Sequence, residues 1–261
     1  MSRVKRDPDG FHEEMIKMIE KFYVEYADFK RNPTGRSVRL ARLSIFLCQV
    51  FEYYRGDLKF LVETISSLLE TYAGQMTFLN REKCLQCLII LSKKGFWKAE
   101  EAIKFYTRLL MLQDKNLREL IHKHIIQLIK RHDYHGKNST IHRNLLQFFQ
   151  KVIGEGEDDL IKRTVKILVS LYTKGVWKDT KTINVISSAC MGSFDKSVKL
   201  ASMFFVDTTE KIEEQLNSSS EEEEEDDYEK NLQKVGLCAI LLFGLDALIN
   251  AQTLIDVGKD P

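Results

Sequence analysis

A stretch of more than 200 residues without proline is the feature that most constrains how this chain can fold. The sequence has three prolines, Pro8, Pro33 and Pro261, so residues 34–260 contain none. Proline breaks helix interiors and often marks turns, so its absence favours long helices joined by short loops. Hydrophobic residues make up 44% of the 261 residues. We therefore expect a soluble chain with a packed core.

Apolar residues recur at helical spacing along most of the chain. Within residues 160–172 they fall on one face of a helix, which indicates an amphipathic helix with one buried side. The stripe consists of Leu160, Ile161, Thr164, Val165, Leu168, Leu171 and Tyr172. The same pattern elsewhere predicts ten helices, over residues 11–30, 36–55, 58–72, 80–94, 98–112, 115–132, 140–154, 158–174, 178–191 and 195–206.

Several residues are suited to start or end these helices. The short polar side chains of Asn80 and Asp114 can accept hydrogen bonds from unpaired backbone N–H groups, so we predict both as N-caps. Gly95 and Gly175 each follow a lysine at a predicted helix end. We predict that both take the left-handed conformation that closes a helix.

The two glycines belong to an internal repeat. Residues 91–98 match residues 171–178 at an offset of 80, and the only two tryptophans, Trp97 and Trp177, occupy equivalent positions. An offset of 80 corresponds to two units of about 40 residues, the length of a HEAT or armadillo helix pair. The alternative is a chance match between helical segments. We predict an all-α fold, a right-handed α-solenoid of HEAT/armadillo-like helix pairs with about ten helices.

Charge is distributed unevenly, although the net charge is +1. Residues 1–206 hold 35 basic and 23 acidic residues, whereas residues 207–229 hold 12 acidic residues and one basic one. We predict a helical-repeat domain over 1–206, an acidic and largely disordered linker over 207–229, and a short apolar helical tail over 230–261. The basic body indicates a polyanionic or mixed-charge partner, and ordinary solvated lysines are the alternative.

Two groups of residues could in principle bind a metal. Cys84 and Cys87 have the spacing of half a zinc site, but no second Cys-x-x-Cys follows, so we expect core packing. His132, His135 and His142 flank a predicted loop, and we expect a solvated loop there rather than a metal site. Because phosphate-binding glycine loops and nucleophile elbows are also missing from the sequence, we expect no enzyme activity, cofactor or metal.

The candidate partner-binding residues are Lys174, Trp177, Lys178 and Lys181, which lie together after the second glycine cap. Lysines on solvated helix faces can neutralise phosphates. A tryptophan beside a helix-closing glycine can instead be an anchor in the core, and this alternative is open.

Three segments resemble the severe-depolymerisation-of-actin family. Residues 5–11 are similar to its Arg-Asp-Pro opening with a following aromatic residue, and residues 114–125 to its Asp-Lys-x-Leu-Arg segment with a following His-Ile. Residues 176–190 resemble its Trp-x-Asp-x-Lys-Thr-x-Asn-x-Ile-x-x-Ala-Cys block. The resemblance covers roughly residues 1–227, as far as the acidic run.

This resemblance implies a nuclear and nucleolar protein that acts in maturation and export of the pre-60S ribosomal particle. It also implies an indirect link to actin organisation. The partners would be assembly factors, ribosomal proteins and the rRNA backbone, with no membrane and no small-molecule substrate. The alternative functions are a nuclear transport adaptor, whose groove would need acidic and Trp/Asn ladders, and a general interaction scaffold.

Overall fold

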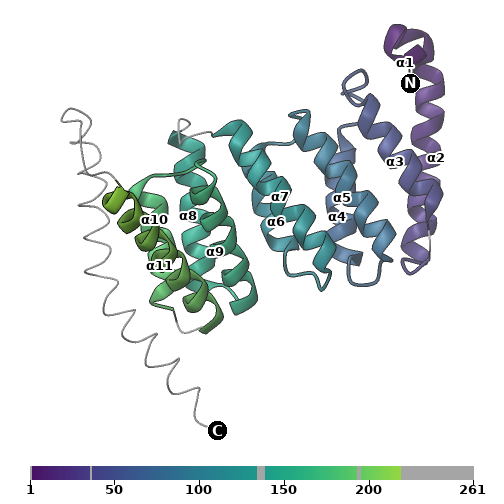
Figure 1. Ribbon diagram of the computed structural model, residues 1–261. Coiled ribbons are helices and arrows are strands. Elements are labelled where there is room, and N and C mark those ends of the chain that lie inside the picture. The colour runs from purple at the N-terminus through teal and green to yellow at the C-terminus, as the bar shows by residue number, and fades with distance from the viewer. Residues whose placement is uncertain (1, 36, 134–138, 193–194, 219–261) are drawn as a thin grey trace. The chain divides into compact units, whose positions relative to one another are not determined.

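The computed structural model describes all residues except 1, 36, 134–138, 193–194 and 219–261. The described residues are helical, with no strand among them, so the predicted all-α fold is confirmed (Figure 1). In chain order the elements are α1 (Ser2–Arg6), a 3-10 turn (Asp9–Phe11), α2 (His12–Arg31), α3 (Val38–Val50), α4 (Phe60–Tyr72), α5 (Phe78–Lys93), α6 (Ala99–Leu109), α7 (Lys115–His132), α8 (Ser139–Glu155), α9 (Asp158–Thr173), α10 (Thr180–Cys190) and α11 (Asp195–Ser218).

Four of these elements differ clearly from the sequence-based expectation. The α1 helix and the 3-10 turn were not predicted, and α3 ends at Val50, five residues before its predicted end. The α11 helix continues to Ser218, twelve residues beyond its predicted end at 206. Residues 207–218 contain no Gly or Pro and several Glu, Lys and Gln, so helix propensity extends the helix into the segment that we assigned to the linker. The acidic run 221–227 and the tail 230–261 lie outside the described residues.

The chain divides into two compact units, with the division between Leu128 and Ile129. In unit 1, which precedes the division, α3 packs against both α2 and α5, and α4 packs against α5. Large apolar side chains such as Phe22, Leu47 and Leu88 are fully buried there. The α2, α3, α4 and α5 helices thus each cover a neighbour, as a repeat protein requires,.

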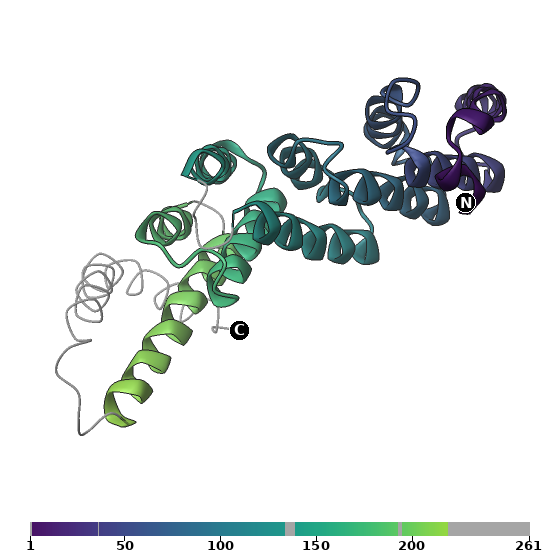
Figure 2. The ribbon, with the colours of Figure 1, turned by 90° about the horizontal axis from the view of Figure 1, so that it is seen from above.

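Unit 2, which follows the division, is built from two layers of helices. The α8 and α10 helices contact one another in one layer, and α9 and α11 contact one another in the other (Figure 2). The α8–α9 and α10–α11 pairs pack across the layers. Phe149, Val165 and Ile186 are among the fully buried residues between them. This arrangement is that of two stacked helix pairs.

Both predicted glycine caps are confirmed. Gly95 and Gly175 have φ angles of 76° and 68°, in the left-handed region. After α9, the Gly175 N–H donates to the Tyr172 carbonyl at 2.9 Å, and the Val176 N–H donates to the Leu171 carbonyl at 2.9 Å. Gly95 and Phe96 make the same pair of bonds after α5. These are the two bonds of a Schellman motif, so the repeat at an offset of 80 reproduces one backbone geometry.

Of the two predicted N-caps, Asp114 is confirmed and Asn80 is wrong. The Asp114 carboxylate accepts from the Leu117 N–H at 3.1 Å, so Asp114 caps α7 as predicted. Asn80 does not cap α5, because Thr77 Oγ1 accepts from the Asn80 N–H instead. The α5 helix begins two residues earlier than predicted, at Phe78. Asn80 therefore lies in the first turn, and its amide donates to the Gly35 carbonyl.

A histidine held between two aspartates joins three segments of unit 2. His142, near the start of α8, lies with Nδ1 3.1 Å from Asp133 Oδ2 and Nε2 2.6 Å from Asp179 Oδ2. Asp133 follows α7, and Asp179 caps α10 by accepting from the Thr182 N–H at 3.0 Å. We call His142, Asp133 and Asp179 the Asp–His–Asp clamp. His142 lies in the helix predicted over 140–154, but its side chain is 7% exposed and therefore is not part of the solvated loop that we expected beside it.

The clamp changes the pKa values of His142 and Asp179. Burial disfavours the charged imidazole of His142, but hydrogen bonds and attraction from the two carboxylates outweigh this, so its pKa is raised above the ordinary 6.5. Burial also acts to raise the pKa of Asp179, but hydrogen bonds from His142 and Thr182 lower it to about 2. A protonated imidazole can donate to both carboxylates at once. The clamp therefore stabilises the folded chain most when His142 is charged.

The glycine cap after α9 predicts that replacing Gly175 destabilises the folded chain. Gly175→Ala should lower the free energy of unfolding by about 1 kcal/mol, because an alanine at a left-handed φ is strained. Gly154, near the end of α8, has open space around its Cα and no positive φ, so Gly154→Ala should raise it by about 0.5 kcal/mol. Urea unfolding of the two variants measures both changes. An equal effect of the two substitutions would contradict the cap assignment.

The clamp predicts a pH-dependent loss of stability. Because the folded-state pKa of His142 is raised, its contribution is fully present below pH 6.5 and is lost as the pH rises through the folded-state value,. His142→Gln should therefore cost about 2 kcal/mol at acidic pH and less at alkaline pH. His132 is the control, because burial and Arg131 lower its pKa. His132→Gln should show the opposite trend in unfolding experiments across this range. Parallel pH trends for the two variants would disprove the clamp.

Candidate interaction surface

Trp177, one of the four predicted partner-binding residues, is buried in unit 2. Its side chain is 1% exposed, and its indole N–H lies 2.9 Å from Asp133 Oδ2 and 3.3 Å from the Asp133 carbonyl. The indole also meets the His142 ring edge-on, with 4.5 Å between ring centroids. Trp177 therefore anchors the turn after α9 to the clamp. Of the two roles considered for this tryptophan, partner contact and core anchor, the structure shows the core anchor. In this position it cannot touch a partner directly.

Lys174, Lys178 and Lys181 are exposed around this buried anchor. Lys174 is the C-cap that follows α9, Lys178 lies in the turn, and Lys181 lies in the first turn of α10. Their role in binding a partner stays a prediction. The fold adds three further exposed cations to the same end of unit 2, because the clamp ties the end of α7 and the start of α8 to this turn. We call the resulting set the basic rim: Lys130, Arg131, Arg143, Lys174, Lys178 and Lys181.

The three added cations could not be found from sequence proximity alone. Lys130 and Arg131 are separated from Lys174 by more than 40 residues, and Arg143 belongs to a third helix. A usable signal was the Asp179-Thr-x-Thr182 stretch, in which an aspartate precedes a helix start. This stretch predicts the cap of α10. It does not predict that the same carboxylate also reaches His142.

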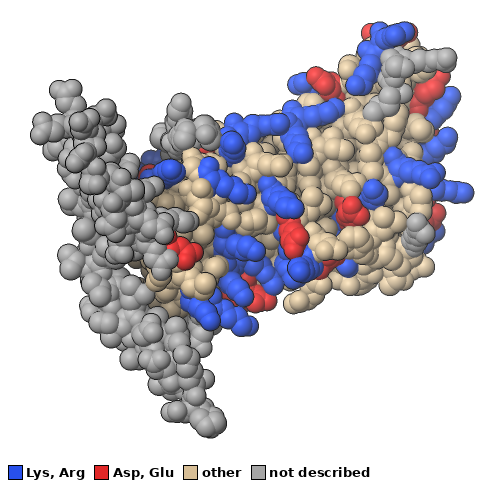
Figure 3. Space-filling model, viewed as in Figure 1, with Lys and Arg blue, Asp and Glu red and all other residues tan. Residues whose placement is uncertain are grey.

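Positive charge dominates the basic rim. Its described stretches, 129–133, 139–146 and 171–184, contain six Lys and Arg residues but two carboxylates, Asp133 and Asp179. The Asp133 side chain is fully buried, and that of Asp179 is 40% exposed and faces His142. The space-filling view shows Lys and Arg side chains spread over much of the visible face (Figure 3). Of these two acidic groups, Asp133 is turned inward and Asp179 is bonded to His142.

Large apolar side chains are exposed elsewhere in unit 2. Met191 is 72% exposed after α10, and Met203 and Val206 are 53% and 39% exposed on α11. None of the large hydrophobic residues exposed in the described part of the chain belongs to the basic rim. The exposed apolar residues of unit 2 therefore lie outside the basic rim.

The Cys84–Cys87 pair lies in a packed region of unit 1. Cys87 is fully buried, and its hydrogen bond with Cys48, together with burial, raises its pKa well above the ordinary value. Burial raises the pKa of the Cys84 thiol to about 12. The surroundings of both residues thus favour the neutral thiol. The predicted core packing is confirmed for Cys87.

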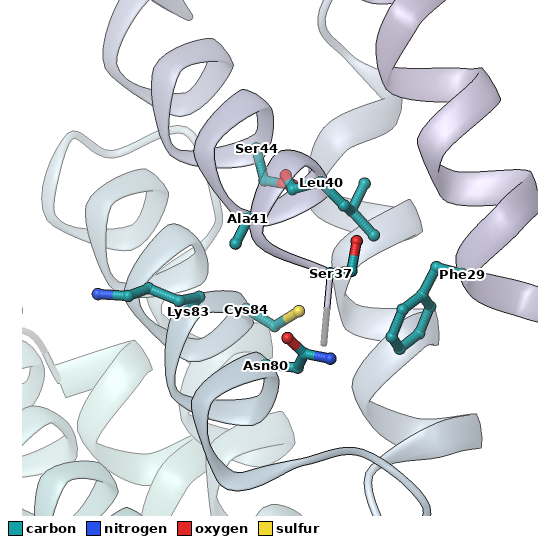
Figure 4. A pocket seen from close by; sticks show the side chains of 8 residues that line it. All are labelled: Phe29, Ser37, Leu40, Ala41, Ser44, Asn80, Lys83 and Cys84. Atoms are coloured by element: carbon teal, nitrogen blue, oxygen red, sulfur yellow. The ribbon is translucent and has the colours of Figure 1, made fainter. Parts of the chain in front are cut away.

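A small cavity beside Cys84 is too small for a ligand. It lies between α2, α3 and α5 and has a volume of about 10 Å³, close to that of one water molecule (Figure 4),. Its walls are formed by Phe29, Ser37, Leu40, Ala41, Ser44, Asn80, Lys83 and Cys84. Among the described residues, no three His, Cys, Asp or Glu side chains are placed to hold a metal ion. In that same part of the chain, no helix has both the length and the apolar composition to cross a membrane.

Comparison with known proteins agrees with the repeat architecture. Residues 46–239 match the family model described as "SDA1, HEAT repeat". Protein SDA1 homolog of Nematostella vectensis is 29% identical over 213 residues, which cover 79% of this chain and 31% of the relative. The Xenopus tropicalis homolog is 28% identical over 208 residues, covering 80% and 30%. The Drosophila melanogaster homolog is 27% identical over 212 residues, covering 81% and 30%.

The chain thus spans about 30% of the length of these curated relatives. The family model matches well over half of the chain, and its HEAT-repeat description agrees with the stacked helix pairs of the two units. The resemblance to this family is therefore confirmed, and the chain belongs to the SDA1 HEAT-repeat family.

Proposed function

We propose that this chain is a non-enzymatic scaffold in the biogenesis and nuclear export of the large ribosomal subunit. In this role it binds pre-60S particles through their proteins and RNA, in the nucleolus and nucleus. The observation that carries the proposal is the match of residues 46–239 to the SDA1 HEAT-repeat family. The resemblance of residues 176–190 to the family's Trp–Cys block adds the ribosomal context.

The structure supports a binding role more than a catalytic one. HEAT repeats present long surfaces of stacked helices, which suit the binding of extended partners. In unit 2 the basic rim and the exposed apolar residues Met191, Met203 and Val206 are separate. A scaffold that holds both RNA and protein needs surfaces of both kinds.

The transport-adaptor alternative receives less support. An adaptor groove would need exposed tryptophans to hold a cargo peptide, but Trp177 is buried. Trp97, at the equivalent repeat position, is half-buried and packs on the rings of Phe105 and Tyr106 at centroid distances of 5.2 and 5.6 Å. The two tryptophans therefore serve as packing residues.

Sedimentation tests the proposed function. The tagged full chain, expressed in eukaryotic cells, should migrate with particles of large-subunit size in a sucrose gradient at low salt. Affinity purification from these fractions should recover precursor RNA of the large subunit. Precursor RNA of the small subunit, measured in the same eluate, is the specificity control. If the chain stays at the top of the gradient, or recovers both precursors equally, the proposal is wrong.

A further inference from the structure

The six cations of the basic rim come from four different helix ends. Lys130 and Arg131 lie in the last turn of α7, Arg143 lies near the start of α8, and Lys174, Lys178 and Lys181 surround the turn from α9 to α10. We propose that the basic rim binds the phosphate backbone of double-stranded RNA. The choice of RNA as the polyanion rests on the proposed function in ribosome biogenesis.

The local charge favours a polyanion. Each carboxylate in the described stretches of the rim accepts hydrogen bonds within the clamp region: Asp133 from the Trp177 indole, and Asp179 from Thr182. Both carboxylates of these stretches thus have partners within the clamp region, while the six cations are exposed to solvent. The α8 and α10 helices also begin at this end (Figure 1). Their N-terminal dipoles add partial positive charge there.

The backbone beneath these cations is held in place. Lys174 and Lys178 bracket a Schellman turn whose valine, Val176, is fully buried. Arg143 follows the clamped His142, and Lys181 follows the clamped Asp179 by two residues. Since the α-carbons of these cations are fixed by tertiary contacts, binding has to order only their side chains. A rigid array of this kind suits a rigid duplex.

The described rim lacks the groups that other partners require. Proteins that bind single-stranded nucleic acid stack bases on exposed aromatic rings, but Trp177 is buried and no large hydrophobic residue of the rim's described part is exposed. Protein interfaces likewise centre on aromatic or apolar anchors with few charges. Duplex RNA is recognised mainly by shape and phosphate contacts, for which exposed lysines and arginines are sufficient.

Fluorescence anisotropy with a labelled RNA duplex of arbitrary sequence tests this proposal on the full chain. The variant Lys174→Gln/Lys178→Gln/Lys181→Gln should weaken binding at least tenfold at low salt. It should also reduce the slope of log affinity against log salt by about 2 to 3, since each lost phosphate contact removes nearly one unit. The matched control, Lys162→Gln/Lys166→Gln/Lys199→Gln, removes three exposed lysines elsewhere in unit 2. It should change the affinity less than twofold.

Each alternative result has a defined meaning. Equal loss in the two triple variants would overturn the proposal, because it would show a response to net charge alone. Unchanged binding by the rim variant would overturn it as well. Rim-dependent binding of poly-glutamate without binding of the duplex would identify an acidic protein as the partner instead. Thermal unfolding of both variants checks that they fold. Because purified components are used, failure here leaves the sedimentation result intact, and the reverse also holds.

Discussion

Each helix pair of this chain has apolar surface on more than one side, so no pair can bury its surface alone. In unit 1, α3 is covered by α2 and α5, and in unit 2 α9 is covered by α8, α10 and α11. The stacking of pairs is the constraint on which the rest of the structure depends. It requires short, sharply defined turns that return the chain to the next pair. The left-handed glycines at positions 95 and 175 provide two such turns.

The turn at Gly175 also links stability to the candidate surface. Because the Schellman motif places Val176 and Trp177 in the core, the lysines on either side of them are left in solvent. The indole of Trp177 then bonds to Asp133, whose carboxylate also holds His142. The ends of α7, α8, α9 and α10 are fixed relative to one another by these contacts. The basic rim is therefore a consequence of how unit 2 is closed at this end.

Features encoded within one turn of the chain were predictable from the sequence. The two glycine caps and the Asp114 cap were correct, since each depends on residues within five positions. Asn80 was misassigned because Thr77, a second good capping residue, lies three positions earlier. The end of α11 was misplaced because the acidic composition after residue 206 was given more weight than its helix propensity,.

Features that join distant segments were not predictable. The clamp connects residues 133, 142 and 179, and periodicity contains no information about such a contact. His142 was consequently expected only to flank a solvated loop, whereas its side chain is buried and bonded to both aspartates. For the same reason, three of the six rim cations were identified only from the fold. Lys174, Lys178 and Lys181 were predicted because they are neighbours in sequence.

Lysine-directed crosslinking tests the central claim most directly. Particles purified through the tagged chain are treated with 2-iminothiolane, which attaches to lysine amines and couples them to RNA under ultraviolet light. Mass spectrometry then locates the crosslinked lysines. The account predicts crosslinks to large-subunit precursor RNA at Lys174, Lys178 and Lys181, and few at Lys162, Lys166 and Lys199. Crosslinks concentrated on the second set of lysines, or the absence of crosslinked RNA, would contradict it.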